Sequence, residues 1–246
     1  MLLYDVVAGQ DARGVVHAGR LALQIDQAAR WDFPDLYRDE IEVHWQRRLS
    51  DNPSFFNGSV MLMLSGGRVD GDTLACSFVA TDFKSYLYWR DQGFADQQVR
   101  DAFGSGLVWS SDGALMLVRQ SAGQVNTGLT YFPGGFIDDR DLDADGRIDI
   151  AASVSRELAE ETGLSATELE RVPGYVISSC GPQLSFGVQF RSALTAATLK
   201  ARIMAFIAQD EKPELSDVLF MTTPQLEDGG AFAPYAEVLA EHMLAE

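Results

Sequence analysis

The chain has 246 residues, of which 46% are hydrophobic, so it is long enough to bury the core of one large domain or two small ones. Its formal net charge is −17 at pH 7. This charge argues against nucleic acid polymers and anionic membranes as partners, because contacts to phosphate need clustered Lys and Arg.

The sequence also indicates the cellular compartment of the protein. The first residues show no basic segment followed by an apolar stretch, and no apolar run is long enough for a spanning helix, so we expect a cytoplasmic protein. Cys76 and Cys180 are too few for a disulfide framework and lack the spacing of a metal site. We interpret both as buried thiols.

The first hundred residues alternate between strand and helix patterns. Apolar segments at 2–8 and 15–27 predict two short strands, and a helix is expected from Pro34 to just before Asn52. Residues 59–65 and 73–80 predict a hairpin, since a Gly- and Asp-rich segment separates them.

Residues 82–92 predict a short helix that is rich in aromatic side chains. Tyr86 and Trp89 lie on it, followed by Arg90. Aromatic faces pair with planar bases, so Tyr86, Tyr88 and Trp89 are candidates for stacking on a base or a sugar. Arg90 is a further candidate for binding substrate. An ordinary aromatic core explains Tyr86 and Trp89 equally well.

The rest of the chain predicts a sheet with helices on either side. Strands are expected at 107–109, 114–119, 129–132, 172–178, 183–194 and 218–221, and helices over 195–209 and near the C-terminus. This pattern favours an α/β fold with residues 105–246 as the main domain and residues 1–104 as an accessory α/β region. No Pro- or Ser-rich linker separates the two.

A helix between these strands carries a cluster of acids. Glu157, Glu160 and Glu161 stand at i, i+3 and i+4, so they share one face, and the opposite face is apolar. Three clustered carboxylates repel one another unless a cation neutralises them. Hard cations such as Mg²⁺ take oxygen ligands. The spacing therefore predicts a divalent-cation site.

The sequence Arg-Glu-Leu-Ala-Glu-Glu-Thr-Gly-Leu from Arg156 resembles the second half of the Nudix box at every fixed position. The first half departs, because Gly135 and Arg156 are seven residues further apart than in the family pattern. Counting forward from Gly135, the first Glu of the box falls on Asp141. Counting back from Arg156, it falls next to Asp149. Both assignments stay open.

The resemblance implies a Nudix α/β/α sandwich with a mixed sheet and a hydrolase of diphosphate bonds that depends on Mg²⁺ or Mn²⁺. Glu157, Glu160 and Glu161 match the family's metal ligands. Arg156 matches an arginine that pairs with a glutamate of the box, and Gly135 matches a glycine whose carbonyl can ligate the metal.

Two further roles follow from the resemblance. A general base in this family often comes from a loop after the box, and Glu211 and Glu214 are the candidates, although a solvated acidic loop is the alternative. Arg119 ends a strand that faces the box in the expected topology. It is a candidate for holding a phosphate, and a surface cation is the alternative.

The inserted residues have a motif of their own. Asp141, Asp143 and Asp145 occupy the first, third and fifth positions of a calcium-loop pattern, with Asp149 near its end. Ala152 stands where a bidentate Glu is expected. A Ca²⁺ site and a solvated turn are both consistent with this segment.

The N-terminal region suggests a substrate. Its Trp45, its Asn52-Pro53 dipeptide and its aromatic helix are similar to the Nudix branch that cleaves UDP-sugars to UMP and a sugar 1-phosphate. A UDP-sugar such as UDP-glucose is thus the first substrate expected. Coenzyme A diphosphates and ADP-ribose or NADH are alternatives, as is a non-catalytic nucleotide-sensing module. Many Nudix proteins are dimers, so a homodimer is possible.

Overall fold

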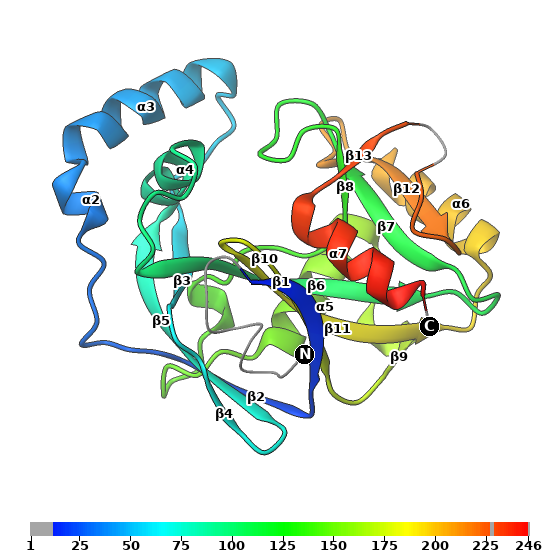
Figure 1. Ribbon diagram of the computed structural model, residues 1–246. Coiled ribbons are helices and arrows are strands. Elements are labelled where there is room, and N and C mark those ends of the chain that lie inside the picture. Colours follow the sequence, from blue (N-terminus) through cyan, green and yellow to red (C-terminus); the bar gives the residue numbers. More distant parts are fainter. Residues whose placement is uncertain (1–11, 227–228, 246) are drawn as a thin grey trace.

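A computed structural model describes residues 12–226 and 229–245 (Figure 1). The strand expected at residues 2–8 lies outside the described residues. Within them, thirteen strands join in one mixed sheet, whose main path runs β1-β10-β11-β6-β3-β5-β2. No helix in the described ranges combines the length and hydrophobicity needed to span a bilayer.

Six α-helices and thirteen strands are seen in the described part of the chain. The helices are α2 (Phe33–Leu36), α3 (Arg38–Asp51), α4 (Phe83–Asp91), α5 (Ile150–Thr162), α6 (Ala196–Ile207) and α7 (Pro234–Met243). The strands are β1 (Arg13–Ala18), β2 (Arg20–Ile25), β3 (Ser59–Leu64), β4 (Arg68–Asp70), β5 (Thr73–Asp82), β6 (Val99–Trp109), β7 (Leu115–Gln120), β8 (Leu129–Tyr131), β9 (Leu169–Arg171), β10 (Tyr175–Cys180), β11 (Gln183–Ser192), β12 (Leu215–Met221) and β13 (Ala231–Phe232).

The central strand β6 is covered by a helix on each face. Gly104 and Gly106 lie directly under Val154 and Leu158 of α5, so that a side chain at either glycine would press on the helix. Phe103 points the other way, and its ring packs against Tyr235 of α7. Figure 1 accordingly shows α7 in front of the central strands and α5 behind them. The predicted α/β/α sandwich is confirmed.

The N-terminal region adds strands to the same sheet. β3 pairs antiparallel with β6 at Met63 and Leu64, and β1 pairs antiparallel with β10. The predicted boundary between residues 104 and 105 falls inside β6. The helices α2, α3 and α4 enclose a second core, which includes Trp31, Trp45 and Trp89. The accessory region is therefore continuous with the sheet of the main domain.

The inserted residues form a small closed loop against the N-terminal region. Leu142 and Ile148 bridge its two ends, and the backbone N–H of Ile148 donates to the carbonyl of Leu23 in β2 over 2.9 Å. The backbone N–H of Ile25 donates to Gly146 at the same distance. The insertion thus connects β2 to the start of α5.

Candidate active site

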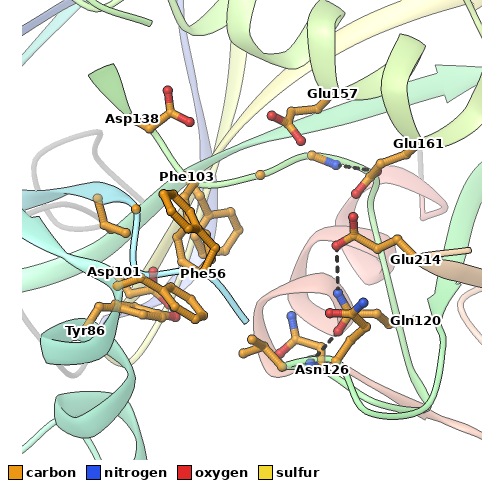
Figure 2. A pocket seen from close by; sticks show the side chains of 18 of the residues that line it. Phe56, Tyr86, Asp101, Phe103, Gln120, Asn126, Asp138, Glu157, Glu161 and Glu214 are labelled. Carbon is orange, nitrogen blue, oxygen red and sulfur yellow. Dashed lines mark hydrogen bonds between the residues drawn. The ribbon is translucent and has the colours of Figure 1, made fainter. Parts of the chain in front are cut away.

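A pocket of about 380 Å³ opens between the α4 region and α5 (Figure 2). One side carries Glu157, Glu161 and Glu214, which we call the carboxylate wall. Eight aromatic residues line the pocket, and we call five of them the aromatic wall: Phe56, Phe83, Tyr86, Phe103 and Phe136. In Figure 2 the labelled members of the two walls lie on opposite sides of the pocket.

Helix α5 aims Glu157 and Glu161 at the pocket because its other face is held on the sheet, while Glu160 is exposed and lies outside the pocket lining. Asp149 caps its start by accepting from the backbone N–H groups of Ala151 and Ala152 at 3.1 and 3.0 Å. Gly163 ends it in the left-handed conformation, with φ of 70°. Val154 and Leu158 are buried against β6, which leaves the glutamate face towards the pocket.

The loop before the insertion approaches these acids closely. Gly134 has φ of 147°, and a side chain there would collide with the backbone oxygen of Gly104. Its N–H donates to Oε2 of Glu161 over 3.2 Å. A Cβ on Gly135 would stand 2.7 Å from Oε2 of Glu157. The backbone therefore requires a glycine at position 134, whereas a side chain at position 135 would displace the Glu157 carboxylate.

The ionised forms of the acids in the carboxylate wall are destabilised by burial and by one another. Burial raises the pKa of Glu161 well above its usual value, and the charges of Glu214 and Glu157 raise it further. Burial likewise raises the pKa values of Glu157 and Glu214. A bound cation would relieve this repulsion and favour the ionised forms.

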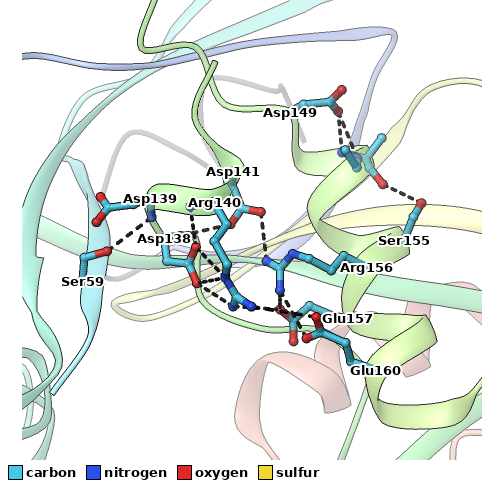
Figure 3. Close-up of polar contacts among 12 residues, drawn as sticks. Ser59, Asp138, Asp139, Arg140, Asp141, Asp149, Ser155, Arg156, Glu157 and Glu160 are labelled. Carbon is cyan, nitrogen blue, oxygen red and sulfur yellow. Dashed lines mark hydrogen bonds and ion pairs between the residues drawn. The ribbon is translucent and has the colours of Figure 1, made fainter. Parts of the chain in front are cut away.

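Arg156 of α5 connects three acids beside the pocket (Figure 3). It donates to Oδ1 of the buried Asp141 over 2.9 Å, to Glu157, and to Oε2 of Glu160 over 3.3 Å. Asp141 is thus the acid that pairs with the arginine of the box, as forward counting from Gly135 gives. Asp149 has the separate role of capping α5. The seven extra residues consequently follow Asp141.

A second arginine at the pocket mouth was not a sequence candidate. Arg140 holds Asp138 with its Nε and Nη2 atoms at 2.7 to 3.1 Å, and lies 3.9 Å from Glu157 and 3.8 Å from Glu160. Within the described residues that line the pocket, five are acids and Arg140 alone is basic. The acids are Asp101, Asp138, Glu157, Glu161 and Glu214.

Comparison with known protein families identifies the family to which this chain belongs. Residues 100–241 match the NUDIX domain. The chain belongs to the NUDIX domain family. Family membership supports the predicted enzyme class, a hydrolase of diphosphate bonds. A comparison with curated protein sequences finds no significant match.

Solved structures with Nudix folds resemble this chain at low identity. The NUDIX domain of Shewanella oneidensis NrtR, complexed with ADP ribose, is 19% identical, with 59% of this chain and 86% of that chain covered and a TM-score of 0.38. DR0079 from Deinococcus radiodurans is 16% identical, with 61% and 86% covered and a TM-score of 0.41. The MutT protein of Methanosarcina mazei Go1 is 18% identical, with 58% and 91% covered and a TM-score of 0.39.

The glutamates expected to bind metal lie close together, but each is directed at a protein group. No group of three or more His, Cys, Asp or Glu side chains in the described ranges is placed to hold an ion as it stands. Glu157 and Glu160 contact Arg156 instead, while Glu161 accepts from the Gly134 backbone.

The four aspartates of the insertion do not converge on one point. Asp141 faces Arg156, Asp149 caps α5, and Asp145 pairs with Arg147 over 2.8 Å. Asp143 accepts from backbone N–H groups of its own turn. Each carboxylate already has a protein partner, so the structure favours the solvated turn and gives the calcium hypothesis no support.

Two residues expected to bind substrate are structural. Trp89 is fully buried and packs against Trp31 and Phe94 in the N-terminal core, so its assignment to the binding wall is wrong. Arg90 donates to the carbonyl of Val125 over 3.1 Å and to Asn126, and thereby supports a pocket loop without lining the pocket. Tyr86 does line the pocket.

Two further candidates lie outside the pocket lining. Arg119 donates to Thr130 Oγ1 over 3.2 Å, and its neighbour Gln120 faces the pocket because alternate strand residues point to opposite faces. The expected phosphate contact of Arg119 is therefore wrong. Glu211 is exposed and Glu214 lines the pocket, accepting from Gln120 over 3.4 Å. Of these two acids only Glu214 lies in the pocket lining, so it is the one that stays a candidate for the general base.

Most of the aromatic wall could not be predicted from the sequence. Its residues come from the loop before β3, from α4, from β6 and from the loop after β8. Asp101 and Gln183, from adjacent strands, complete the far end of the pocket. Their position in one pocket depends on strand pairing, which a local motif does not reveal.

Proposed function

We propose that this Nudix protein is a hydrolase that depends on a divalent metal and cleaves a nucleoside diphosphate linked to a second group, with UDP-sugars as the first substrates to test. The charge of the pocket supports this most directly. Five acids and one arginine line it, so an anionic diphosphate would be repelled unless cations accompany it.

The residues fit Mg²⁺ or Mn²⁺, since Glu157, Glu160 and Glu161 offer only hard carboxylate oxygens. These three would hold the metal once Glu157 and Glu160 turn from Arg156. Such an ion supplies positive charge that neutralises phosphate oxygens and makes the attacking water more acidic. Burial raises the pKa values of Glu157 and Glu161, and the charge of such an ion would favour their ionised forms.

Other side chains would perform the remaining tasks. Glu214 would accept the proton of the attacking water, because burial raises the pKa of its carboxyl towards the neutral range where a general base works best. Arg140 would bind a phosphate oxygen by exchanging part of its contact with Asp138. Arg156 would stay anchored by the buried Asp141 behind the metal ligands when Glu157 and Glu160 turn from it.

The aromatic wall is suited to a nucleoside. Tyr86 and Phe136 pack edge to face with ring centroids 4.7 Å apart, and Phe56, which is 80% exposed, lies free at the rim. A base can stack on such rings in a site of this size. The similarity of the N-terminal region to UDP-sugar hydrolases makes uridine the first base to test.

A substrate panel tests the proposal. The protein would be incubated with UDP-sugars, ADP-ribose, NADH, coenzyme A and dinucleoside polyphosphates, with Mg²⁺ or with EDTA. We expect hydrolysis at the diphosphate bond of at least one compound, most strongly a UDP-sugar, and its loss in EDTA. Binding without hydrolysis of any compound would instead support the nucleotide-sensing alternative.

A further inference from the structure

Gln120 connects the loop after β7 to the carboxylate wall. It is the last residue of β7, is 7% exposed, and lines the pocket between Asn126 and Glu214 (Figure 2). Its Oε1 atom accepts from the backbone N–H of Asn126, and its Nε2 atom donates to Oε1 of Glu214 over 3.4 Å. One side chain thus links a loop backbone to the acid proposed as the general base.

The orientation of the Gln120 amide is fixed by its two partners. A backbone N–H can only donate, so the amide oxygen has to face Asn126 and the NH₂ group has to face Glu214. The reverse orientation would place the amide oxygen against the carboxylate and the NH₂ group against the backbone N–H, and both hydrogen bonds would be lost. Gln120 is therefore a fixed donor towards Glu214.

The loop that sets this orientation is itself held from the accessory region. Arg90 of α4 donates to the carbonyl of Val125 over 3.1 Å and to Oδ1 of Asn126 over 3.0 Å. Asn52, directly after α3, donates to the carbonyl of Gly123 over 2.8 Å. The backbone N–H that orients Gln120 thus belongs to a segment with side-chain contacts on both sides of it.

The strands place Gln120 beside Glu214, and the hydrogen bond then holds the carboxylate. β7 and β12 pair antiparallel with Gln120 opposite Leu215, and the N–H of Ser121 donates to the carbonyl of Glu214 over 2.8 Å. Within the described residues, Gln120 is the one side chain that donates to the Glu214 carboxylate. Burial and the charge of Glu214 both raise the pKa of Glu161, so these two acids repel. Without the donor, the flexible Glu214 side chain would be free to turn from the wall towards solvent.

We infer that Gln120 is a positioning residue for the reaction, whose NH₂ group holds the Glu214 carboxylate in the orientation that accepts a proton from the attacking water. The inference rests on the proposed function and deepens it. Gln120 occupies Oε1 of Glu214, so Oε2 is left to take the proton while the water oxygen bonds to phosphorus and the bond to the bridging oxygen breaks. The donor also favours the ionised carboxylate, which is the form that acts as a base.

Two variants of Gln120 test this role. Gln120→Glu keeps an oxygen for the N–H of Asn126 and nearly the same shape, but replaces the donor to Glu214 with a second oxygen. Gln120→Met removes the donor without adding charge. We expect each to lower kcat about tenfold, because part of the general-base effect depends on the placement of the carboxylate, while KM changes about twofold or less. Gln27→Met, in an exposed turn after β2, is the control and should change nothing.

A double-mutant cycle separates positioning from a merely structural effect. In a Glu214→Gln protein the group through which Gln120 acts is already changed, so adding Gln120→Met should lower kcat further by about twofold or less. A further tenfold loss in that background would overturn the inference. A higher KM with unchanged kcat in the single variants would also overturn it, since Gln120 would then bind substrate directly.

A crystal structure of Gln120→Met tests the same contact without any activity. We expect the Glu214 carboxylate to leave its wild-type position, either turned towards solvent or divided between conformers. A single conformer identical to that of wild type would show that Gln120 does not hold the carboxylate. If Gln120→Met does not fold, Gln120→Glu, which keeps the loop contact, serves for the same comparison.

The two hypotheses fail separately. If wild-type protein hydrolyses no compound with Mg²⁺, the proposed function fails, and the crystal structures still decide whether Gln120 holds Glu214. If wild-type protein is active and Glu214→Gln lowers kcat while neither Gln120 variant does, the proposed function stands and the role of Gln120 is refuted.

Discussion

The two walls of the pocket differ in chemistry and in how the chain builds them. The carboxylate wall takes Glu157 and Glu161 from one short helix that is packed on the central sheet, with Glu214 joining from the loop before β12. The aromatic wall is assembled from four separate segments, most of them in the accessory region. The difference teaches that the reaction and the choice of substrate are supported by different parts of the chain, so they can be disrupted one at a time.

The largest effect should come from the carboxylate wall. Glu161→Gln removes a charge at the expected metal site, and we expect kcat to fall about a thousandfold because several kcal/mol of metal-derived stabilisation are lost. The melting temperature should not fall, since the pKa of Glu161 is raised by burial and by neighbouring charges. Steady-state kinetics checks this against Glu170→Gln, an exposed change in β9. Full activity in Glu161→Gln would defeat the metal-site assignment.

The second prediction compares Glu214 with Glu211, two acids of the same loop. Glu214→Gln should lower kcat about a hundredfold if Glu214 accepts the proton, which is the usual range for general bases. Glu211→Gln, exposed and three positions earlier, should leave kcat unchanged. A pH–rate profile of both variants is the measurement. Equal losses in the two variants would contradict the role given to Glu214.

The support behind the carboxylate wall can be tested through stability. Asp141→Asn breaks the buried pair with Arg156, and we expect the free energy of unfolding to fall by about 2 kcal/mol, less than for a fully buried pair because Arg156 is partly exposed. Asp145→Asn, in the same insertion, alters an exposed pair with Arg147 and should cost under about 0.5 kcal/mol. Urea unfolding measures both. The reverse order would show that the insertion, rather than Asp141, stabilises the box.

The smallest effect concerns the arginine at the mouth. Arg140→Ala should raise KM about tenfold with Mg²⁺ present, because a charge-assisted bond to phosphate is lost. Arg147→Ala, which removes an exposed arginine seven positions away, should have no effect on KM. Kinetics with the best substrate of the panel distinguishes the two. An unchanged KM in Arg140→Ala would contradict the phosphate contact of Arg140 and would indicate that metal alone binds the phosphate.

The two walls also differ in how well they could be predicted from the sequence. Glu157, Glu160 and Glu161 were predictable because helical spacing alone places them on one face, and the strands and helices around them follow apolar periodicity. Arg119 was assigned to the wrong face of β7. Neighbouring residues of a strand point to opposite faces of the sheet, so an error of one residue in the expected orientation moves a side chain to the other face. Trp89 could not be told from Tyr86 by pattern, since both lie on the same aromatic helix and only packing decides which one reaches the pocket.

The insertion shows a similar limit. Its calcium-like spacing is real, but its carboxylates serve Arg156, Arg147 and the cap of α5. Asp101 belongs to no motif, and only the pairing of β6 with β11 places it in the pocket beside Gln183.

The central claim is that α5 presents its glutamates to divalent ions at the diphosphate end of the pocket. Anomalous diffraction from crystals grown with Mn²⁺ and a non-hydrolysable nucleoside diphosphate analogue tests it most directly. The account predicts anomalous peaks between Glu157, Glu160, Glu161 and the phosphates, with the base against the aromatic wall. Ordered analogue in the pocket with no peak at these glutamates, or with manganese held elsewhere, would contradict it.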